Sequence, residues 1–170
     1  MDRVISIALI HEELYKGKNT DVINFSQYIK VLAESLLLTY RLDIEVNLDF
    51  GLEENLFLDM DTAIPLGIII NEIVSNSFKY AFSGRDKGEI RIKLFRKENG
   101  ECKNEGFKST TFILSISDNG IGIPKDLDIE NLGSLGLQLV TTLVDQLDGE
   151  LELKRDNDTE FTIRFTVIEE

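Results

Sequence analysis

The sequence predicts a single α/β domain, because helical and strand-like hydrophobic patterns are interspersed along its 170 residues. Two stretches, 24–40 and 61–82, place apolar residues at the three- and four-residue spacing of helices. Other stretches alternate apolar and polar residues or are rich in β-branched side chains, as strands are. The predicted strands are 43–50, 56–58, 89–95, 110–117, 151–153 and 161–167. A chain of this length is large enough to bury a core within one domain.

Composition and charge narrow the class of protein. The chain has 18 basic and 31 acidic side chains and a formal net charge of −13, which disfavours nucleic-acid binding and contact with anionic membranes. Its single cysteine, Cys102, permits no internal disulfide and indicates a reducing compartment. No stretch has the length of a membrane span or the features of a signal peptide. We therefore expect a cytoplasmic protein.

The N-terminal stretch, Met1 to Lys16, has a helical period and contains the only histidine, His11. This histidine could be a phosphoacceptor, a base or a metal ligand, although a lone helical histidine is more often structural. No other histidine is present to complete a metal site, and Cys102 is far away in the sequence. Because the helix begins abruptly with no capping residue, we expect the chain to be part of a longer protein.

A polar stripe interrupts the otherwise apolar helix predicted at 61–82, whose start Asp59 or Asp61 could cap. At about 100° per residue, Glu72, Ser75, Asn76 and Lys79 share one face. Such a stripe can be an ordinary solvated face. Asparagine and serine are poor helix formers in mid-helix, however, so their presence favours a functional use.

The stretch from Asp118 to Pro124, Asp-Asn-Gly-Ile-Gly-Ile-Pro, follows directly on the predicted strand at 110–117. The strand would deliver the carboxylate of Asp118 to a fixed place at a sheet edge or cleft. Gly120 and Gly122 would then let the backbone approach a ligand without a Cβ in the way. This arrangement suits a flat heterocycle that carries an amino group. The alternative is a simple polar turn, for which the same residue types are common.

A third cluster opens a further helix, which the pattern extends to about Leu147. Ser134-Leu135-Gly136-Leu137 stands at its start, where free backbone N–H groups can bind an anion. The chain contains neither the glycine-rich loop of P-loop proteins nor the dinucleotide-binding Gly-x-Gly-x-x-Gly after a strand.

In this order the three clusters resemble the nucleotide-binding boxes of the GHKL ATPase superfamily. Residues 72–82 resemble the N box, 118–124 the first G box and 134–137 the second. The pattern is most similar to sensor histidine kinases with a short ATP lid, over roughly residues 50–167. The resemblance implies a two-layer α/β sandwich of the Bergerat type, with a mixed sheet covered by helices on one face. One departure is Asp158, where the family usually has glycine.

The resemblance also implies roles for single residues, with ATP and Mg²⁺ as ligands. Asn76 would bind Mg²⁺, and Lys79 would contact phosphate. Glu72 would lie near the γ-phosphate, where it serves as a base or a water-orienting group in hydrolysing relatives. Tyr80 would lie beside the nucleotide, and Asp118 would accept a hydrogen bond from the adenine amine. The remaining implied nucleotide-binding positions are Gly120, Gly122 and Ile123 near the base and Ser134, Leu135, Gly136 and Leu137 near the phosphates.

Residues 1–17 resemble the second helix of a dimerisation hairpin, which leaves 18–170 as the catalytic ATP-binding domain. In the family the phosphorylated histidine lies on the first helix, so His11 does not match it. The resemblance implies transfer of the γ-phosphate to a histidine on that helix, which would precede this chain, and then to a response regulator. It also implies a homodimer in the full-length protein. The alternatives are a GHKL serine kinase of the anti-sigma-factor type and a non-catalytic nucleotide-sensing module.

Overall fold

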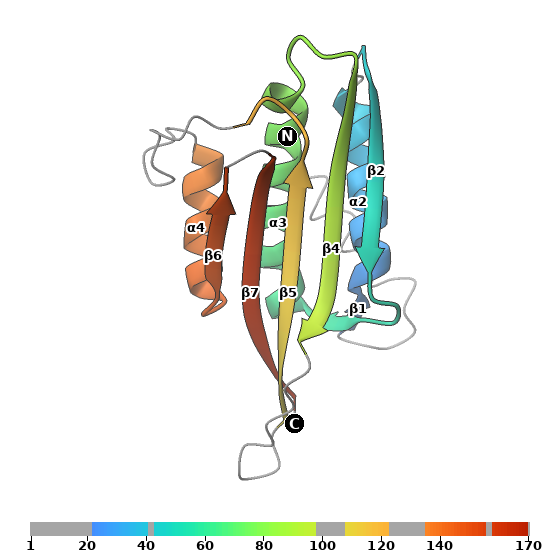
Figure 1. The fold of residues 1–170 in the computed structure, drawn as a ribbon. Coiled ribbons are helices and arrows are strands. Elements are labelled where there is room, and N and C mark those ends of the chain that lie inside the picture. Colours follow the sequence, from blue (N-terminus) through green and yellow to red (C-terminus); the bar gives the residue numbers. More distant parts are fainter. Residues whose placement is uncertain (1–21, 41–42, 98–107, 123–134, 156–157, 170) are drawn as a thin grey trace.

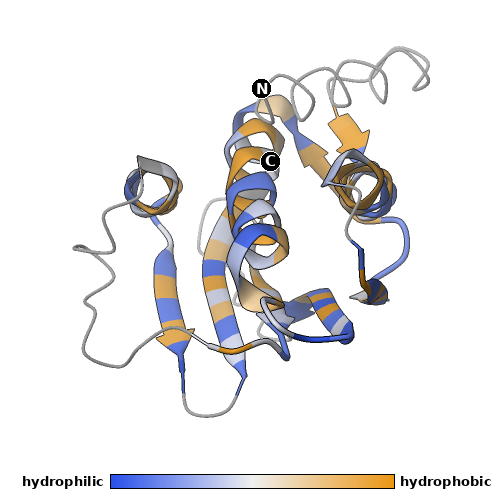
Figure 2. Cartoon of the chain, turned by 90° about the horizontal axis from the view of Figure 1, so that it is seen from above, coloured by the Kyte–Doolittle hydropathy of each residue, from blue (hydrophilic) through white to orange (hydrophobic). Residues whose placement is uncertain are grey.

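The computed structural model describes residues 22–40, 43–97, 108–122, 135–155 and 158–169 as two layers (Figure 1). One layer is a five-stranded sheet, and the other consists of helices α2 (Phe25–Tyr40), α3 (Met60–Asn76) and α4 (Leu135–Gln146). The view from above shows these helices together on one side of the sheet (Figure 2). The predicted two-layer sandwich is therefore confirmed.

The sheet is mixed, as predicted. Its strands are β2 (Glu45–Leu52), β4 (Lys87–Lys97), β5 (Lys108–Asp118), β6 (Glu150–Lys154) and β7 (Thr159–Glu169). They are ordered β2-β4-β5-β7-β6, with β2 and β4 parallel and every other pair antiparallel. The strand that ends in Asp118 is thus the central one, so this residue lies at the end of the middle strand and not on an edge strand.

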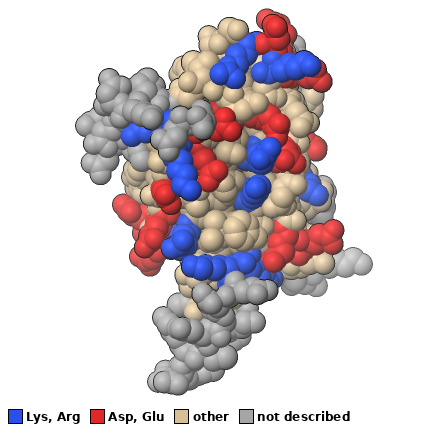
Figure 3. Space-filling model, viewed as in Figure 1, with Lys and Arg blue, Asp and Glu red and all other residues tan. Residues whose placement is uncertain are grey.

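Alternation along the strands separates the two faces of the sheet. On β4, Ile90, Ile92 and Leu94 are fully buried beneath the helices, whereas Arg91 and Lys93 between them are exposed. The outer face carries intermixed acidic and basic side chains (Figure 3). Each fully buried leucine or isoleucine stabilises the fold by about 1.5–3 kcal/mol relative to exposure, so this core holds the two layers together.

A second, two-stranded sheet lies at the start of α2. It pairs β1 (Val22–Asn24) with β3 (Phe57–Asp59), and the N–H of Phe25 donates to the carbonyl of Leu56 at 2.8 Å. The sequence predicted β3 but not β1, whose last residue, Asn24, was assigned to the helix predicted at 24–40.

Helix α3 begins as predicted and ends differently. The Asp59 carboxylate caps it by accepting from the N–H of Thr62 at 3.0 Å. The predicted helix at 61–82 is α-helical only to Asn76, after which η1 (Ser77–Ala81) forms a π-helix. π-Helical turns are rare and often occur at functional sites. Among the described residues, no helix combines the length and hydropathy needed to cross a membrane.

Candidate functional site

Asp118 connects two of the clusters that the sequence singled out. It is only 8% exposed, yet both oxygens are held: Oδ2 accepts from the hydroxyl of Ser77 at 2.8 Å and Oδ1 from the N–H of Gly120 at 3.0 Å. Burial raises the pKa of the Asp118 carboxyl, and the bonds from Ser77 and Gly120 only partly oppose that rise. The structure thus contains a fixed, partly desolvated carboxylate at the C-terminal end of the central strand.

A close contact with the backbone of η1 explains why residue 120, two positions after Asp118, is a glycine. A Cβ added at Gly120 would lie 2.2 Å from the carbonyl oxygen of Ala81, in η1. The same oxygen accepts from the N–H of Ile121 at 2.7 Å. The loop after β5 therefore runs directly against the π-helical turn, and only glycine fits there. Gly122 has φ +82° with open space around it, a conformation that favours glycine.

The polar stripe of α3 is narrower than predicted. Glu72 and Asn76, one turn apart, are half-buried, whereas Ser75 is 2% exposed. The helical projection placed Ser75 on the same face as Glu72 and Asn76, and the structure shows that it is buried in α3, against which both α2 and α4 pack. The hydroxyl of Ser75 and the amide of Asn71, also buried, have no hydrogen-bond partner among the described residues.

Lys79 and Tyr80 lie in η1 and are exposed. The ammonium of Lys79 is 5.8 Å from the ring centroid of Tyr40, at the end of α2, and that ring packs against Phe78. Tyr80 is 65% exposed. The side chain of Lys79 thus extends towards α2 in this structure, so its expected phosphate contact stays a prediction.

The start of α4 lies at the same end of the molecule as the end of β5 and η1 (Figure 1). Leu135 and Gly136 are in its first turn, where N–H groups lack intrahelical partners. Leu137, by contrast, is 9% exposed and belongs to the hydrophobic core. Ile123 and Ser134, also predicted site residues, lie outside the described residues.

The polar face of α3 could supply part of a Mg²⁺ site. The described residues contain no group of three or more histidine, cysteine, aspartate or glutamate side chains that could hold a metal ion. They do offer the amide oxygen of Asn76 beside the carboxylate of Glu72. Mg²⁺ at phosphate sites commonly takes only one or two protein ligands, with phosphates and water completing its shell.

Ser77, Arg85 and Asn119 hold the site together, and sequence reasoning gave them no role. Arg85 bonds to Asn119, just after β5, from 34 residues away in the sequence, and Ser77 bonds to Asp118, the last residue of β5, from 41 residues away. A serine next to the stripe in mid-helix was the one available signal, and it did not identify the partner.

Two family models match the chain. The one described as histidine kinase-, DNA gyrase B- and HSP90-like ATPase covers residues 61–169, and one described as histidine kinase covers 1–40. The blue-light-activated histidine kinase 2 of Erythrobacter litoralis is 28% identical over 90% of this chain and 42% of its own length. The sensor histidine kinase PdtaS of Mycobacterium tuberculosis is 29% identical over 97% of this chain and 31% of its own length. The chain thus spans less than half of either relative.

Other matches are structural or partial. The histidine kinase domain of a blue-light activated histidine kinase from Erythrobacter litoralis has a TM-score of 0.81 at 24% identity, over 96% of this chain and 72% of that one. The catalytic domain of histidine kinase ThkA has a TM-score of 0.62 at 17% identity, over 87% of this chain and 95% of that one. These identities show a shared fold alone. The serine-protein kinase RsbW of Listeria monocytogenes is 33% identical over 48% of this chain and 54% of its own length.

The longer family match covers well over half of the chain, and the relatives that align along most of it are histidine kinases. The chain therefore belongs to the histidine kinase-, DNA gyrase B- and HSP90-like ATPase family, as an ATP-binding catalytic domain of the histidine kinase type.

Proposed function

We propose that this domain binds Mg²⁺–ATP between α3, the loop after β5 and the start of α4. It then transfers the γ-phosphate to a histidine on a dimerisation hairpin, and a response regulator takes the phosphate from there. The observation that carries the proposal is the carboxylate of Asp118, fixed by Ser77 and Gly120 next to the half-buried polar face of α3. Membership of the family implies ATP binding, and the remaining assignments extend it.

Asp118 is the residue that would recognise the base. A carboxylate oxygen has more than one acceptor site, so each oxygen can accept from the adenine amine while keeping its bond to Ser77 or Gly120. Those two bonds fix the direction of the carboxylate before ligand arrives, which reduces the entropy lost on binding. Gly122 would leave room for the ring, with Ile123 beside it, and Gly120 would keep the loop close against η1.

The α3 face would handle the phosphates. Asn76 would hold Mg²⁺, and the bound ion would neutralise part of the negative charge of the phosphates. Backbone N–H groups of Ser134, Leu135, Gly136 and Leu137, at and before the start of α4, would donate to phosphate oxygens. Lys79 would add a positive charge after leaving the ring of Tyr40, and Tyr80 would flank the nucleotide. Such local donors are needed, because the chain as a whole carries a net charge of −13.

Transfer requires an imidazole nitrogen of the acceptor to bond to the γ-phosphorus while the bond from that phosphorus to the β–γ bridging oxygen breaks. ADP leaves with the electron pair of that bond. Glu72, half-buried on α3, is the base that would take the imidazole proton. This domain supplies positioning and charge; the acceptor histidine lies on the hairpin to which we assign residues 1–17 as part of the second helix.

The proposed partners follow from this reaction. They are a response regulator, the dimerisation hairpin and a second copy of the full-length protein. We propose a cytoplasmic location for the domain, since its single cysteine indicates a reducing compartment. We propose neither nucleic acid nor a membrane as its partner, because the net charge of the chain is −13.

The domain should be incubated with γ-labelled ATP, Mg²⁺ and a separately made dimerisation hairpin. We expect acid-labile label on a histidine of the hairpin. In a parallel incubation with a candidate protein substrate in place of the hairpin, acid-stable label on a serine would instead favour the serine kinase alternative, which the partial RsbW match supports. ATP binding without any transfer would favour a nucleotide-sensing module.

A further inference from the structure

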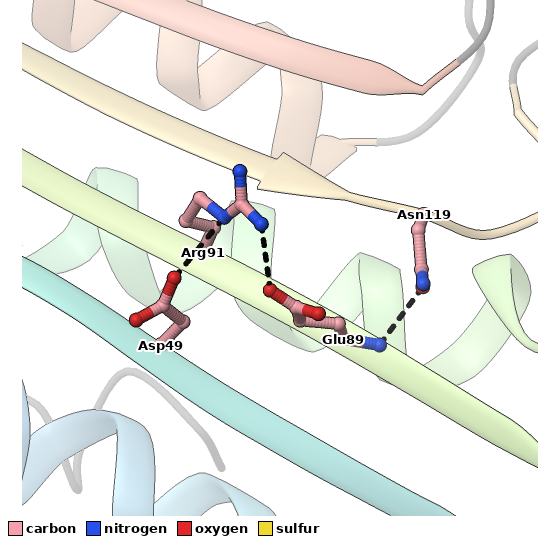
Figure 4. Close-up of polar contacts among 4 residues, drawn as sticks. All are labelled: Asp49, Glu89, Arg91 and Asn119. Carbon is pink, nitrogen blue, oxygen red and sulfur yellow. Dashed lines mark hydrogen bonds and ion pairs between the residues drawn. The ribbon is translucent and has the colours of Figure 1, made fainter.

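Asn119 has an unusual set of bonds where the chain leaves β5. Its N–H donates to the carbonyl of Glu89 at 3.2 Å. Its side-chain oxygen accepts from the N–H of Glu89 at 2.8 Å, the bond drawn between these two residues in Figure 4. Its own carbonyl accepts from the guanidinium of Arg85 at 2.7 Å. Arg85 lies in the segment that joins η1 to β4, and Glu89 lies in β4 itself.

In an antiparallel ladder, a hydrogen-bonded pair exchanges two backbone bonds, each N–H donating to the other carbonyl. Ile90 pairs with Asp118, so Glu89 and Asn119 would form the next pair. One bond of that exchange is made normally. In the other, the side-chain oxygen of Asn119 replaces its backbone carbonyl, which is released to Arg85.

This replacement changes the direction of the chain without loss of a ladder bond. The backbone can turn away from β4 at Asn119 while the N–H of Glu89 stays satisfied. The turn places Gly120 against Ala81, and the N–H of Gly120 then donates to the carboxylate of Asp118. We propose that Asn119 is a positioning residue for base recognition: it sets where the strand ends and hence how Asp118 is presented.

The neighbouring ion pairs provide a control. The guanidinium of Arg91 lies 3.2 Å from Asp49 and 2.9 Å from Glu89 on the outer sheet face (Figure 4). These side chains are between one-third and about half exposed, so the pairs contribute little to stability. Arg91→Ala removes them and leaves the bonds of Asn119 in place.

The inference rests on the proposed function, so its test measures ATP against inosine triphosphate, which has a carbonyl oxygen in place of the adenine amine. Affinities are measured by titration for the unchanged protein and for Asn119→Ala, Asn119→Asp, Arg91→Ala and Asp118→Asn. Asn119→Asp keeps an oxygen acceptor for Glu89, and raised salt screens its added charge. Thermal unfolding is recorded for each.

We expect the unchanged protein and Arg91→Ala to prefer ATP. Asn119→Ala should bind ATP about tenfold more weakly, as loss of one hydrogen bond at the upper end of the usual range gives. It should lose most of its preference for ATP, and Asn119→Asp should retain it. Asn119 is exposed, so the variants should fold; Asn119→Ser, whose hydroxyl is too short to reach Glu89, serves as a second loss variant.

An unchanged preference in folded Asn119→Ala, or an equal loss of affinity for both nucleotides, would overturn the positioning role. If Asp118→Asn loses the preference while Asn119→Ala keeps it, the further inference alone is wrong. If the unchanged protein binds neither nucleotide, the proposed function is wrong and the positioning role is wrong with it.

Discussion

Asp118 combines burial with a need to be charged, and this conflict has a measurable consequence. An acceptor for the adenine amine must be ionised, whereas burial disfavours the ionised form and raises its pKa. ATP affinity should therefore fall on acidification at a higher pH than an ordinary aspartate would set. Titration with ATP across acidic pH checks this, with Asp118→Asn as the control that lacks the transition. An equal pH dependence in both proteins would contradict the assignment.

The same shift predicts how stability depends on pH. A carboxyl whose pKa is higher in the folded state contributes stability below its unfolded pKa and loses it as the pH rises through the folded pKa. Above that pH, Asp118 is a buried charge, so Asp118→Asn should be at least as stable as the unchanged protein at neutral pH. Chemical denaturation at several pH values should show the difference changing in favour of the unchanged protein as the pH falls. A variant that is much less stable at neutral pH would contradict this.

A substitution at Asn76 should distinguish binding of the metal from binding of the base. We predict that Asn76→Ala removes most of the Mg²⁺ dependence of ATP binding and leaves adenosine binding nearly intact, because the amide would contact the metal and not the ring. Asn47→Ala, on an exposed position of β2, is the matched control. Equal losses for ATP and adenosine would show that Asn76 has a structural role.

For single residues, the sequence predicted where a residue stands in its helix or strand better than it predicted the burial and contacts of the side chain. Asp118 stands at the end of a strand as expected, because local pattern decides that position. The burial of Ser75 and the contact of Lys79 with Tyr40 depend on which helices flank α3. Ser77 could not be linked to Asp118 from the sequence, since 41 residues separate them and no local pattern encodes the pairing.

The element that decides the geometry of the site is the π-helical turn η1. It follows α3 without a break and presents the carbonyl of Ala81 to the loop after β5. A helical pattern of apolar residues does not distinguish an α-helical last turn from a π-helical one. The structure therefore corrects the predicted helix at 61–82 at the place where the two motifs meet.

Gly120 tests this contact. Gly120→Ala places a Cβ 2.2 Å from a backbone oxygen, so the loop must shift, and we expect a loss of stability of about 1–3 kcal/mol with weaker ATP binding. Gly84→Ala is the control for backbone strain, since Gly84 has φ +74° and no atom within 4 Å of an added Cβ. It should lose about 1–2 kcal/mol and bind ATP normally. Thermal unfolding and titration measure both; normal ATP binding by Gly120→Ala would contradict a tight contact.

The strands that the sequence predicted are all present, with boundaries shifted by a few residues. β5 extends from the predicted 110–117 to Lys108–Asp118, for example. The order of strands could not be predicted, because alternation shows which face is buried and not which strand is the neighbour. β2 pairs in parallel with β4, although α3 lies between them in the sequence, and no local pattern in either strand encodes this pairing.

For the whole molecule, we propose that the ATP-binding domain phosphorylates a histidine on the first helix of the hairpin. This proposal predicts that His11 is not the phosphoacceptor. We assign His11 to the second helix of the hairpin, where it would lack the in-line approach to a γ-phosphate that transfer requires. With γ-labelled ATP and Mg²⁺, the chain alone should acquire no stable label on His11, whereas a form extended to include the first helix should label there. His11→Gln variants of both are the controls. Acid-labile label on the present chain that disappears in His11→Gln would make His11 the acceptor.

The central claim is that Asp118, held by Ser77 and Gly120, recognises the base of ATP. Isothermal titration of ATP and ADP into the unchanged protein and into Asp118→Asn tests it most directly. We predict that the folded variant binds both nucleotides more weakly by about 1–3 kcal/mol, because an amide cannot match a carboxylate that faces the amine. Unchanged affinity in a folded Asp118→Asn protein would contradict the claim.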